Sequence, residues 1–409
     1  MLVPLDEVRA HIFAAVDALE PTTVARRDAL GLATADAVST PEPVPPFANT
    51  AMDGYAVRAA DTAGAAADAP ARLRVVGELP AGRSPEGMTV GAGEAVRIMT
   101  GAPIPAGADA IVMVEVTERA GDGGVMVVRE ARVGDHIRDA GGDLAAGAEV
   151  FAAGTVLGPA HLGVLASIGR AEVRASPRAR VGVLSTGDEL VESGPLAPGK
   201  IRDSNRPMLL ALVAATGAEP VDLGTARDDE ARITAVLEDA CRRCDVVLTS
   251  GGVSVGDYDY VKAVLDRMGV LQWWQVAIKP AKPLAFGMVG DVPVFGLPGN
   301  PVSSLVSYEL FARPAVLQRM GYPNCFRPEV VATADEAMSR KPDGKLHFDR
   351  VWVRYADGGY HVARSGVQQS NVLSAMAAAN GLALLPDGDG VAQGDPVRVM
   401  LLNPLLFGH

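Results

Sequence analysis

The chain has 409 residues, of which 48% are hydrophobic and 21% are charged, and its formal net charge is −12. This composition is typical of a globular protein with enough apolar material for several cores, and it excludes an intrinsically disordered chain. The length predicts about two to four domains at roughly 100–200 residues each. The negative charge argues against a general nucleic-acid binder, which would present a basic face.

The beginning of the chain, "MLVPLDEVRAHIFAAVDAL", has acidic residues in its first turns and no basic leader. It predicts an amphipathic helix and not a signal peptide. No apolar run approaches the roughly 18–20 residues that span a bilayer. Cys241, Cys244 and Cys325 do not make a disulfide framework, and the single C-x-x-C pair favours a structural role over zinc or redox chemistry. We therefore expect a cytoplasmic protein that binds neither membrane nor nucleic acid.

The N-terminal part reads as a helical unit with an insertion. The proline-dense segment at 39–47, "STPEPVPPF", can be neither helix nor central strand and marks a crossing between units. Short apolar runs separated by Gly, Pro and Asp follow, which indicate β-structure. Helical spacing returns at 157–169, and we expect that segment to pack with the first helix. The pattern predicts a helical domain made of 1–45 and 145–177, with a β-rich domain, 46–144, inserted into it.

The remainder of the chain predicts two further domains. Continuous apolar strands such as "RVGVLSTG", "DVVLTSGG" and "VPVFGLPG" alternate with helical segments over 178–326. This alternation is typical of a doubly wound α/β domain with a parallel sheet covered on both faces. Beyond it, short strands alternate with turns, which predicts a small C-terminal β-barrel domain over 327–409.

Three strand-to-helix junctions of the α/β domain carry polar residues, and the carboxyl ends of parallel strands are where such sheets bind ligands. Glycines let a backbone pass close to a ligand, and free N–H groups at a helix start favour an anion. Aspartates there also stabilise the helix dipole by about 0.3–1 kcal/mol, so a purely structural reading stays open at this point. The junction residues are Asp188 and Glu189; Ser250, Gly251, Gly252, Ser254, Asp257 and Asp259; and Gly299, Asn300, Pro301, Ser303 and Ser304.

The segment "IKPAKP" places two lysines three residues apart, and both Lys279 and Lys282 precede a proline. A residue before proline is pushed towards extended backbone, and polyproline backbone repeats every three residues. We therefore expect both ammonium groups on one side, where they would hold a phosphate or an oxyanion such as molybdate. Nearby carboxylates would hold Mg²⁺ against phosphate oxygens. The alternative is a solvated loop with two lysines.

Several catalytic signatures are missing from the sequence. It contains no Walker P-loop, no G-x-S-x-G elbow and no H-E-x-x-H, and its six histidines show no ligand spacing. We therefore expect chemistry that depends on positioning and charge, without a covalent nucleophile.

The motifs together resemble one family. "NTAMDGYAV", "RIMTGAPIPAGADAIV", "STGDEL", "TSGGVSVGDYDYVK", "AIKPAKPLAFG" and "GLPGNPVSS" occur in the order found in the molybdopterin molybdenumtransferases, which include bacterial MoeA and the gephyrin E domain. The resemblance implies an elongated homodimer with its active site between subunits. It also implies a reaction in which molybdate and adenylylated molybdopterin give molybdenum cofactor and AMP with the help of Mg²⁺.

The resemblance also assigns roles to particular residues. It places Asp53, Thr100, Glu189, Asp228, Asp259, Lys279 and Lys282 at catalytic positions. The ligand-binding set that it implies is Ser250, Gly251, Gly252, Ser254, Pro298, Gly299, Asn300, Pro301, Ser303, Arg350 and Ser370. The carboxylates expected to hold Mg²⁺ are Glu189, Asp228, Asp257 and Asp259.

Two positions depart from the pattern of the family. Gln275 stands where some relatives carry a lysine, which removes one basic anchor. Asp257 stands where glutamate is common, and its shorter side chain would change the geometry around a metal. Read without the resemblance, the pair Asp53-Gly54 is an ordinary turn.

Two other functions remain as alternatives. The molybdopterin adenylyltransferase resembles the α/β domain alone, so the flanking domains argue against it. A gephyrin-like scaffold would be expected to carry a linker and a second enzymatic domain, and we expect neither. The resemblance further implies transient contacts with the adenylyltransferase and with the molybdoenzymes that accept the cofactor.

Overall fold

The computed structural model describes residues 2–251, 260–268 and 270–402. The chain divides into two compact units, which we describe separately. The second unit consists of Asp36–Ala153 and Pro159–Glu172, and the first contains the other described residues. The domain boundaries expected from the sequence stay a prediction. Within the described ranges no helix is both long and apolar enough to cross a bilayer.

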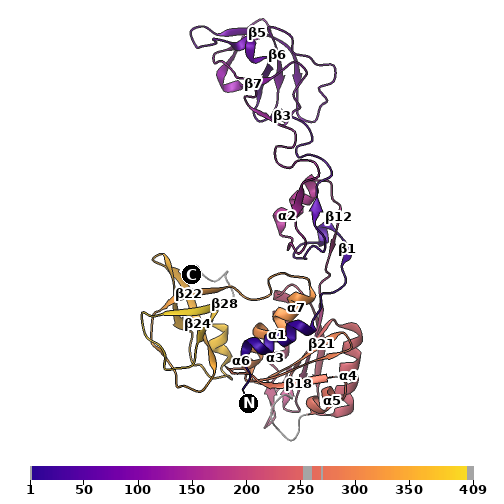
Figure 1. The fold of residues 1–409 in the computed structure, drawn as a ribbon, viewed down its shortest axis with the longest axis vertical. Helices are drawn as coiled ribbons and strands as arrows, with labels where there is room; N and C mark the ends of the chain where they lie inside the picture. Colours follow the sequence, from indigo (N-terminus) through magenta and orange to yellow (C-terminus); the bar gives the residue numbers. More distant parts are fainter. Residues whose placement is uncertain (1, 252–259, 269, 403–409) are drawn as a thin grey trace. The chain divides into compact units, whose positions relative to one another are not determined.

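A six-stranded mixed sheet lies at the centre of the first unit (Figure 1). In spatial order its strands are β16 (Glu219–Ala226), β13 (Arg180–Thr186), β17 (Val246–Ser250), β21 (Val292–Leu297), β20 (Pro283–Val289) and β18 (Val270–Gln275). The first four pair in parallel, whereas β20 and β18 are antiparallel to their neighbours. Only Gly290 and Asp291 join β20 to β21, which is too short for the crossover that parallel strands need.

Helices cover both faces of this sheet. Along β17, Val246 and Leu248 belong to one buried cluster and Val247 to another, because successive side chains of a strand point to opposite faces. The first cluster includes residues of α1 (Leu5–Ala15), α3 (Asn205–Ala215), α6 (Pro301–Ser307), the π-helical segment Tyr308–Ala312 and α7 (Arg313–Arg319). The second includes α4 (Glu230–Arg243) and α5 (Tyr260–Met268). The predicted doubly wound domain is confirmed, with an antiparallel edge that the sequence analysis did not predict.

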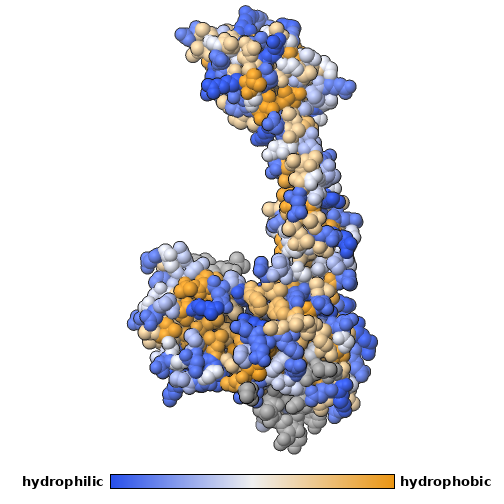
Figure 2. Space-filling view, viewed as in Figure 1, coloured by the Kyte–Doolittle hydropathy of each residue, from blue (hydrophilic) through white to orange (hydrophobic). Residues whose placement is uncertain are grey.

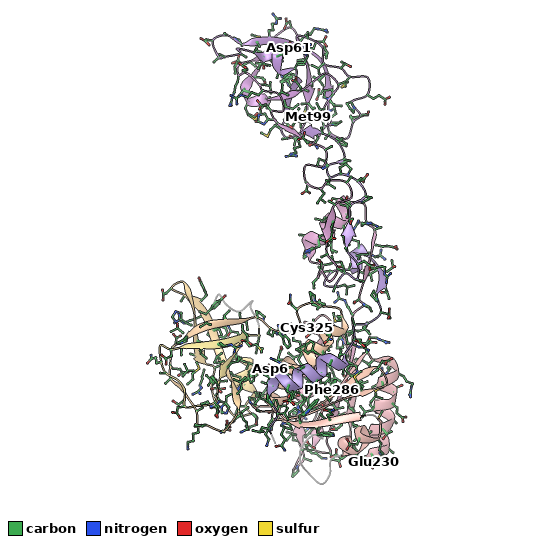
Figure 3. The ribbon with its side chains drawn as sticks, viewed as in Figure 1. Asp6, Asp61, Met99, Glu230, Phe286 and Cys325 are labelled. Atoms are coloured by element: carbon green, nitrogen blue, oxygen red, sulfur yellow. The ribbon has the colours of Figure 1, made fainter. Side chains whose placement is uncertain are left out.

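The first helix belongs to this core. Val8 and Ile12 on its buried face join the cluster that contains Phe286 of β20. The ring of His11 lies 6.3 Å from that of Phe286, and Figure 3 shows Phe286 next to α1. The expected packing of this helix with residues 157–169, which contain α2 (Pro159–Ser167), stays a prediction.

The C-terminal residues of the first unit form a closed five-stranded barrel. Each strand pairs with the next, and β24 also pairs with β26, which closes the circle. In order these strands are β24 (Leu346–Ala356), β25 (Gly359–Arg364), β22 (Glu329–Ala334), β28 (Pro396–Leu401) and β26 (Gly381–Leu385). The predicted C-terminal barrel is confirmed. Figure 2 shows apolar residues on its surface around β22 and β28, where Val331 is 64% exposed.

Shorter elements complete the first unit. β19 (Ile278–Lys279) pairs in parallel with β24 and connects the α/β domain to the barrel. The other short elements are β1 (Thr22–Ala25) with β12 (Glu172–Ala175), β14 (Leu190–Val191) with β15 (Ile201–Arg202), β23 (Met338–Ser339) with β27 (Gly390–Val391), and α8 (Leu373–Ala377).

The second unit is built on another six-stranded sheet. In spatial order its strands are β7 (Ala110–Met113), β4 (Gly54–Val57), β6 (Glu94–Ile98), β5 (Ala71–Leu79), β9 (Gly124–Val127) and β8 (Thr117–Arg119). Two short pairs, β2 (Val38–Ser39) with β11 (Glu149–Phe151) and β3 (Asn49–Thr50) with β10 (Ile137–Arg138), and helix α2 also belong to it. The β-rich character expected from the Gly- and Pro-punctuated sequence is thus present in this unit.

The barrel uses a side-chain amide in place of strand pairing at one point, which gives a first prediction. Asn380 is fully buried, donates from Nδ2 to Val353 O at 2.8 Å, and accepts at Oδ1 from Val353 N at 2.6 Å. Asn380→Ala leaves both backbone groups without these partners, so we expect the free energy of unfolding to fall by about 1–3 kcal/mol. Urea unfolding followed by tryptophan fluorescence, with Trp352 in β24 as the reporter, measures the change.

The matched control for this prediction is Val331→Ala in the same barrel. Its side chain is exposed, so its effect should stay within about 0.5 kcal/mol. Coincident unfolding midpoints for Asn380→Ala and the wild-type protein would contradict the role given to the amide.

Candidate functional site

The three predicted junctions lie side by side at one edge of the central sheet. In the parallel register, Ser185 of β13 lies opposite Ser250 of β17, and Ser250 lies opposite Leu297 of β21. The strands therefore end at nearly the same height, and the described residues that follow them share one edge. Residues 298–300 link β21 to α6, which begins at Pro301, as the Asn-Pro pair predicts.

Ser250 and Gly251 have different surroundings within the second junction. The Ser250 side chain is buried, and Gly251 has φ = 94°, a conformation that favours glycine. A Cβ atom on Gly251 would lie 2.7 Å from the backbone oxygen of Thr186. The glycine therefore serves close packing between the ends of β17 and β13. Four further predicted site residues, Gly252, Ser254, Asp257 and Asp259, lie outside the described residues.

A fourth segment, which the sequence analysis missed, ties the junctions together. Asn205, the first residue of α3, donates from Nδ2 to Ser250 Oγ and to Gly299 O, each at 2.7 Å. Two residues earlier, the Asp203 carboxylate accepts from Ser185 Oγ at 3.1 Å. A polar Asp-Ser-Asn run at a helix start is the same signal as at the other junctions. Here the strands β14 and β15 lie between the end of β13 and this run, so the sequence does not show it as a strand-to-helix turn.

Exposed carboxylates surround the ends of β13 and β16. The backbone N–H of Asp188 donates to Asp228 Oδ2 at 3.3 Å, and the N–H of Asp228 donates to Asp188 Oδ1 at 3.4 Å. Glu189 follows directly and is also exposed. Carboxylate oxygens are the ligands that Mg²⁺ prefers, so the donor chemistry of Glu189 and Asp228 fits this ion. Within the described ranges, no group of three or more metal-ligating side chains is assembled.

Lys279 and Lys282 line one cavity of about 620 Å³. Ser303 of α6 and Ser370 of the barrel domain line it too, and the Val302 N–H donates to Ser370 O at 3.1 Å. The cavity is therefore bounded by the segment after β18, by the first turn of α6 and by a loop of the barrel. Two cationic and two hydroxyl side chains around one space are suited to an oxyanion.

The backbone between the two lysines differs from the predicted polyproline conformation, and that prediction is wrong. Ala281 has φ = 75°, and its side chain is buried in the core of the first unit. Left-handed backbone at a residue other than glycine costs roughly 1–2 kcal/mol, so surrounding structure must maintain it. Burial of the Ala281 methyl group supplies such a constraint. Both lysines still line the same cavity, although the backbone between them turns at Ala281 and does not follow the predicted extended conformation.

A third lysine at the cavity, Lys345, has its charge neutralised by an ion pair with Asp343. Its Nζ donates to Asp343 Oδ2 at 2.8 Å, and His347 Nε2 lies 3.1 Å from Asp343 Oδ1. Burial raises the pKa of Asp343, but the hydrogen bonds from Lys345 and His347 outweigh it and bring the pKa to about 2. Burial lowers the pKa of His347, so this imidazole is neutral at pH 7. No ion pair to Lys279 or Lys282 occurs among the described residues.

Arg350 is only 1% exposed, and its guanidinium group forms hydrogen bonds with backbone carbonyls of the protein. Its Nη2 donates to Val367 O at 2.9 Å and to Gln369 O at 3.1 Å, and burial lowers its pKa. These bonds hold the backbone that leads into Ser370. It also lines a neighbouring cavity of about 640 Å³ together with Lys279. Its expected role as a ligand-binding residue stays a prediction.

In the second unit, Asp53 and Thr100 form a compact pair. Both the N–H and the Oγ1–H of Thr100 donate to Asp53 Oδ1 at 2.7 Å. Gly54 is required next to Asp53, because a Cβ atom there would lie 2.0 Å from Val112 O. The hydrogen bonds from Thr100 lower the pKa of Asp53, and the positive charge of Arg97 adds to this effect. Asp53 therefore stays ionised to lower pH than an ordinary carboxyl group.

This pair gives a prediction about pKa. Thr100→Ala removes the hydroxyl donor and leaves the backbone donor, so the pKa of Asp53 should rise towards the ordinary value of about 3.9. A carbon-detected NMR titration of the Asp53 carboxyl measures it. Thr117→Ala in the same unit is the matched control, because that hydroxyl donates to the Val114 carbonyl and to no described carboxylate. A pKa unchanged by Thr100→Ala would refute the assigned cause.

Comparison with known families agrees with this architecture. Residues 3–169 match the model of the MoeA N-terminal region (domain I and II), residues 182–318 match a probable molybdopterin binding domain, and residues 333–402 match the MoeA C-terminal region (domain IV).

Individual proteins are similar over most of the chain. The molybdopterin molybdenumtransferase 2 of Mycobacterium tuberculosis H37Rv is 42% identical over 390 residues, which cover 93% of this chain and 95% of the relative. The molybdopterin molybdenumtransferase of Haemophilus influenzae is 38% identical over 375 residues, which cover 91% of each chain. The crystal structure of the molybdopterin biosynthesis MoeA protein of Pyrococcus horikoshii OT3 covers 98% of this chain and 100% of that one, with a TM-score of 0.82 and 30% identity. The resemblance inferred from the motifs is confirmed, and the chain belongs to the MoeA family of molybdopterin molybdenumtransferases.

Proposed function

We propose that the protein inserts molybdenum from molybdate into adenylylated molybdopterin, with release of AMP. The observation that carries the proposal is the cavity that Lys279 and Lys282 share with Ser303 and Ser370. It lies beside the helix start that follows β21, whose first turn supplies Ser303 to the cavity wall. Ammonium groups and hydroxyls around one space at a helix start match a substrate pair in which both molecules are anionic.

In this proposal, Lys279 and Lys282 hold molybdate against the dithiolene of the pterin. Their ammonium groups neutralise the oxyanion, and the hydroxyls of Ser303 and Ser370 donate to its oxygens. Positioning of this kind converts a reaction between two dissolved anions into one between neighbours, which lowers the barrier without a covalent intermediate on the protein.

Cleavage of the phosphoanhydride is proposed at the carboxylate-rich part of the same edge. Glu189 and Asp228 would supply oxygen ligands for Mg²⁺, and Asp257 and Asp259 remain proposed members of the set. The ion, when bound, would offset the charge of the pyrophosphate. Thr100 holds the Asp53 carboxylate in one orientation and keeps it ionised, which suits a role next to a cation or a donor.

One experiment tests the function directly. Purified protein is given adenylylated molybdopterin with and without molybdate and Mg²⁺, and AMP is measured. We expect AMP release to depend on both. Formation of adenylylated pterin from ATP and molybdopterin would instead identify an adenylyltransferase, and an unchanged substrate would favour a scaffold.

The lysine pair gives the sharpest mutational prediction. Lys279→Ala and Lys282→Ala should each raise the molybdate concentration for half-maximal AMP release by about ten- to a hundredfold, because a hydrogen bond to a charged group contributes about 1.5–3 kcal/mol. Lys341→Ala is the matched control, since Lys341 lines the neighbouring cavity and is not among the residues that line this one. Wild-type molybdate dependence in both variants would contradict the assignment.

The proposal includes the homodimer, with an active site between subunits, that the resemblance implies. It also includes the cytoplasmic location and the transient contacts with the adenylyltransferase and the acceptor molybdoenzymes. If Asp53 and Lys279 act on one substrate from different subunits, a dimer of two different inactive variants contains one intact site.

Mixing therefore tests the shared site. At a molybdate concentration far below the half-maximal value of Lys279→Ala, Asp53→Ala and Lys279→Ala are each expected to release little AMP alone. Equal amounts co-refolded should recover about a quarter of wild-type AMP release, because half of the dimers are mixed and each has one intact site of two. Light scattering supplies the mass of the assembly. A dimer whose mixture stays inactive would show that both residues act within one subunit.

A further inference from the structure

Both amide hydrogens of Asn205 are engaged at the edge of the sheet, whereas its Oδ1 is buried without a hydrogen-bond partner in the described part of the chain. Asn205 is 8% exposed, and its two Nδ2 hydrogens go to Ser250 Oγ and to Gly299 O, each at 2.7 Å. One side chain thus connects three elements that are far apart in the sequence, namely the start of α3, the end of β17 and the loop after β21. Buried amide donors that are both used fix the position of their acceptors.

The two acceptors lie at the ends of two neighbouring strands of the candidate site. Ser250 ends β17 and leads into the second predicted junction. Gly299 is two residues from Pro301, the start of α6, whose first turn carries Ser303 in the wall of the cavity. The amide of Asn205 therefore bridges Ser250, at the end of β17, and the backbone that leads into the helix supplying a cavity residue.

Asn205 is itself held in place. The Asp203 side chain is 2% exposed, and its carboxylate accepts from Ser185 Oγ, from Thr225 Oγ1 and from the backbone N–H and Nε of Arg206. Ser185 and Thr225 lie at the ends of β13 and β16. Asp203 thus anchors this segment to β13 and β16, and Asn205 connects it to the end of β17 and to the loop after β21.

We propose that Asn205 is a positioning residue of the site. It holds the Ser250 hydroxyl and the backbone before α6 at the separation that the phosphate-bearing pterin substrate requires. This inference rests on the proposed function. The two donors are the essential feature, because an aspartate of the same shape would set a carboxylate oxygen against the Gly299 carbonyl.

The test compares Asn205→Ala and the near-isosteric Asn205→Asp with the wild-type protein. We expect both variants to fold and to raise the dissociation constant of adenylylated molybdopterin, followed by pterin fluorescence, by about ten- to a hundredfold, since small misplacements within a site have effects of this size. KM for the same substrate should rise in parallel. The molybdate concentration for half-maximal AMP release should change less, because Lys279 and Lys282 are left in place.

Asn380→Ala is the matched control. Asn380 is also a buried asparagine, and both hydrogen bonds of its side chain go to Val353 within the barrel. It should lower the unfolding midpoint and leave the dissociation constant unchanged. An equal loss of substrate affinity in Asn380→Ala, or wild-type affinity in a folded Asn205→Asp, would overturn the proposal.

A double-mutant cycle shows whether Asn205 acts through Ser250. Ser250→Ala removes one acceptor, so the further effect of Asn205→Ala should be smaller in that background than in the wild type. Strictly multiplicative effects would refute coupling through the hydroxyl. If the wild-type protein binds the substrate but releases no AMP, the proposed function fails, while the binding measurements still decide the role of Asn205.

Discussion

Parallel pairing of β13, β17 and β21 fixes the height at which each strand ends, and the candidate site depends on this register. Ser185, Ser250 and Leu297 follow one another across the sheet, so the three chains leave it at a common edge. A shift by one residue would turn every side chain of a strand to the other face, so that residues fitted to one buried cluster would have to pack in the other. The doubly covered core therefore enforces the alignment of the junctions.

The cavity depends on how the chain leaves this sheet. After β18 it enters β19, which adds to the barrel by pairing with β24 and places Lys279 opposite His347. The cavity thus draws residues from both the α/β domain and the barrel. The bond between Val302 N and Ser370 O joins the same two domains at the opposite wall. Packing of the two domains therefore brings the cations and the hydroxyls to one cavity.

The charge distribution explains how an acidic protein offers an anion site. The chain carries a net charge of −12. Near the cavity, however, Asp343 forms an ion pair with Lys345, and Asp349 accepts a hydrogen bond from Arg364 at 2.7 Å. These partners compensate the neighbouring cations and leave Lys279 and Lys282 without an acidic partner among the described residues. Because the neighbouring cations are paired with carboxylates, the positive electrostatic potential is confined to the two lysines. A small positive region of this kind favours a small oxyanion over a polyanion such as nucleic acid.

The sequence by itself determined the order of the elements, the doubly wound domain, the barrel and the three polar junctions, because apolar periodicity and turn residues act locally. It also singled out the lysine pair, although Ala281 makes the backbone between them tighter than the predicted polyproline path. Tertiary structure alone decided that β18 joins an antiparallel edge and that α1 covers the central sheet. It also decided that Asn205 reaches Ser250 and Gly299, residues 45 and 94 positions away. Contacts over such separations follow from the register of the sheet and the packing of its helices, which no local pattern in the chain encodes.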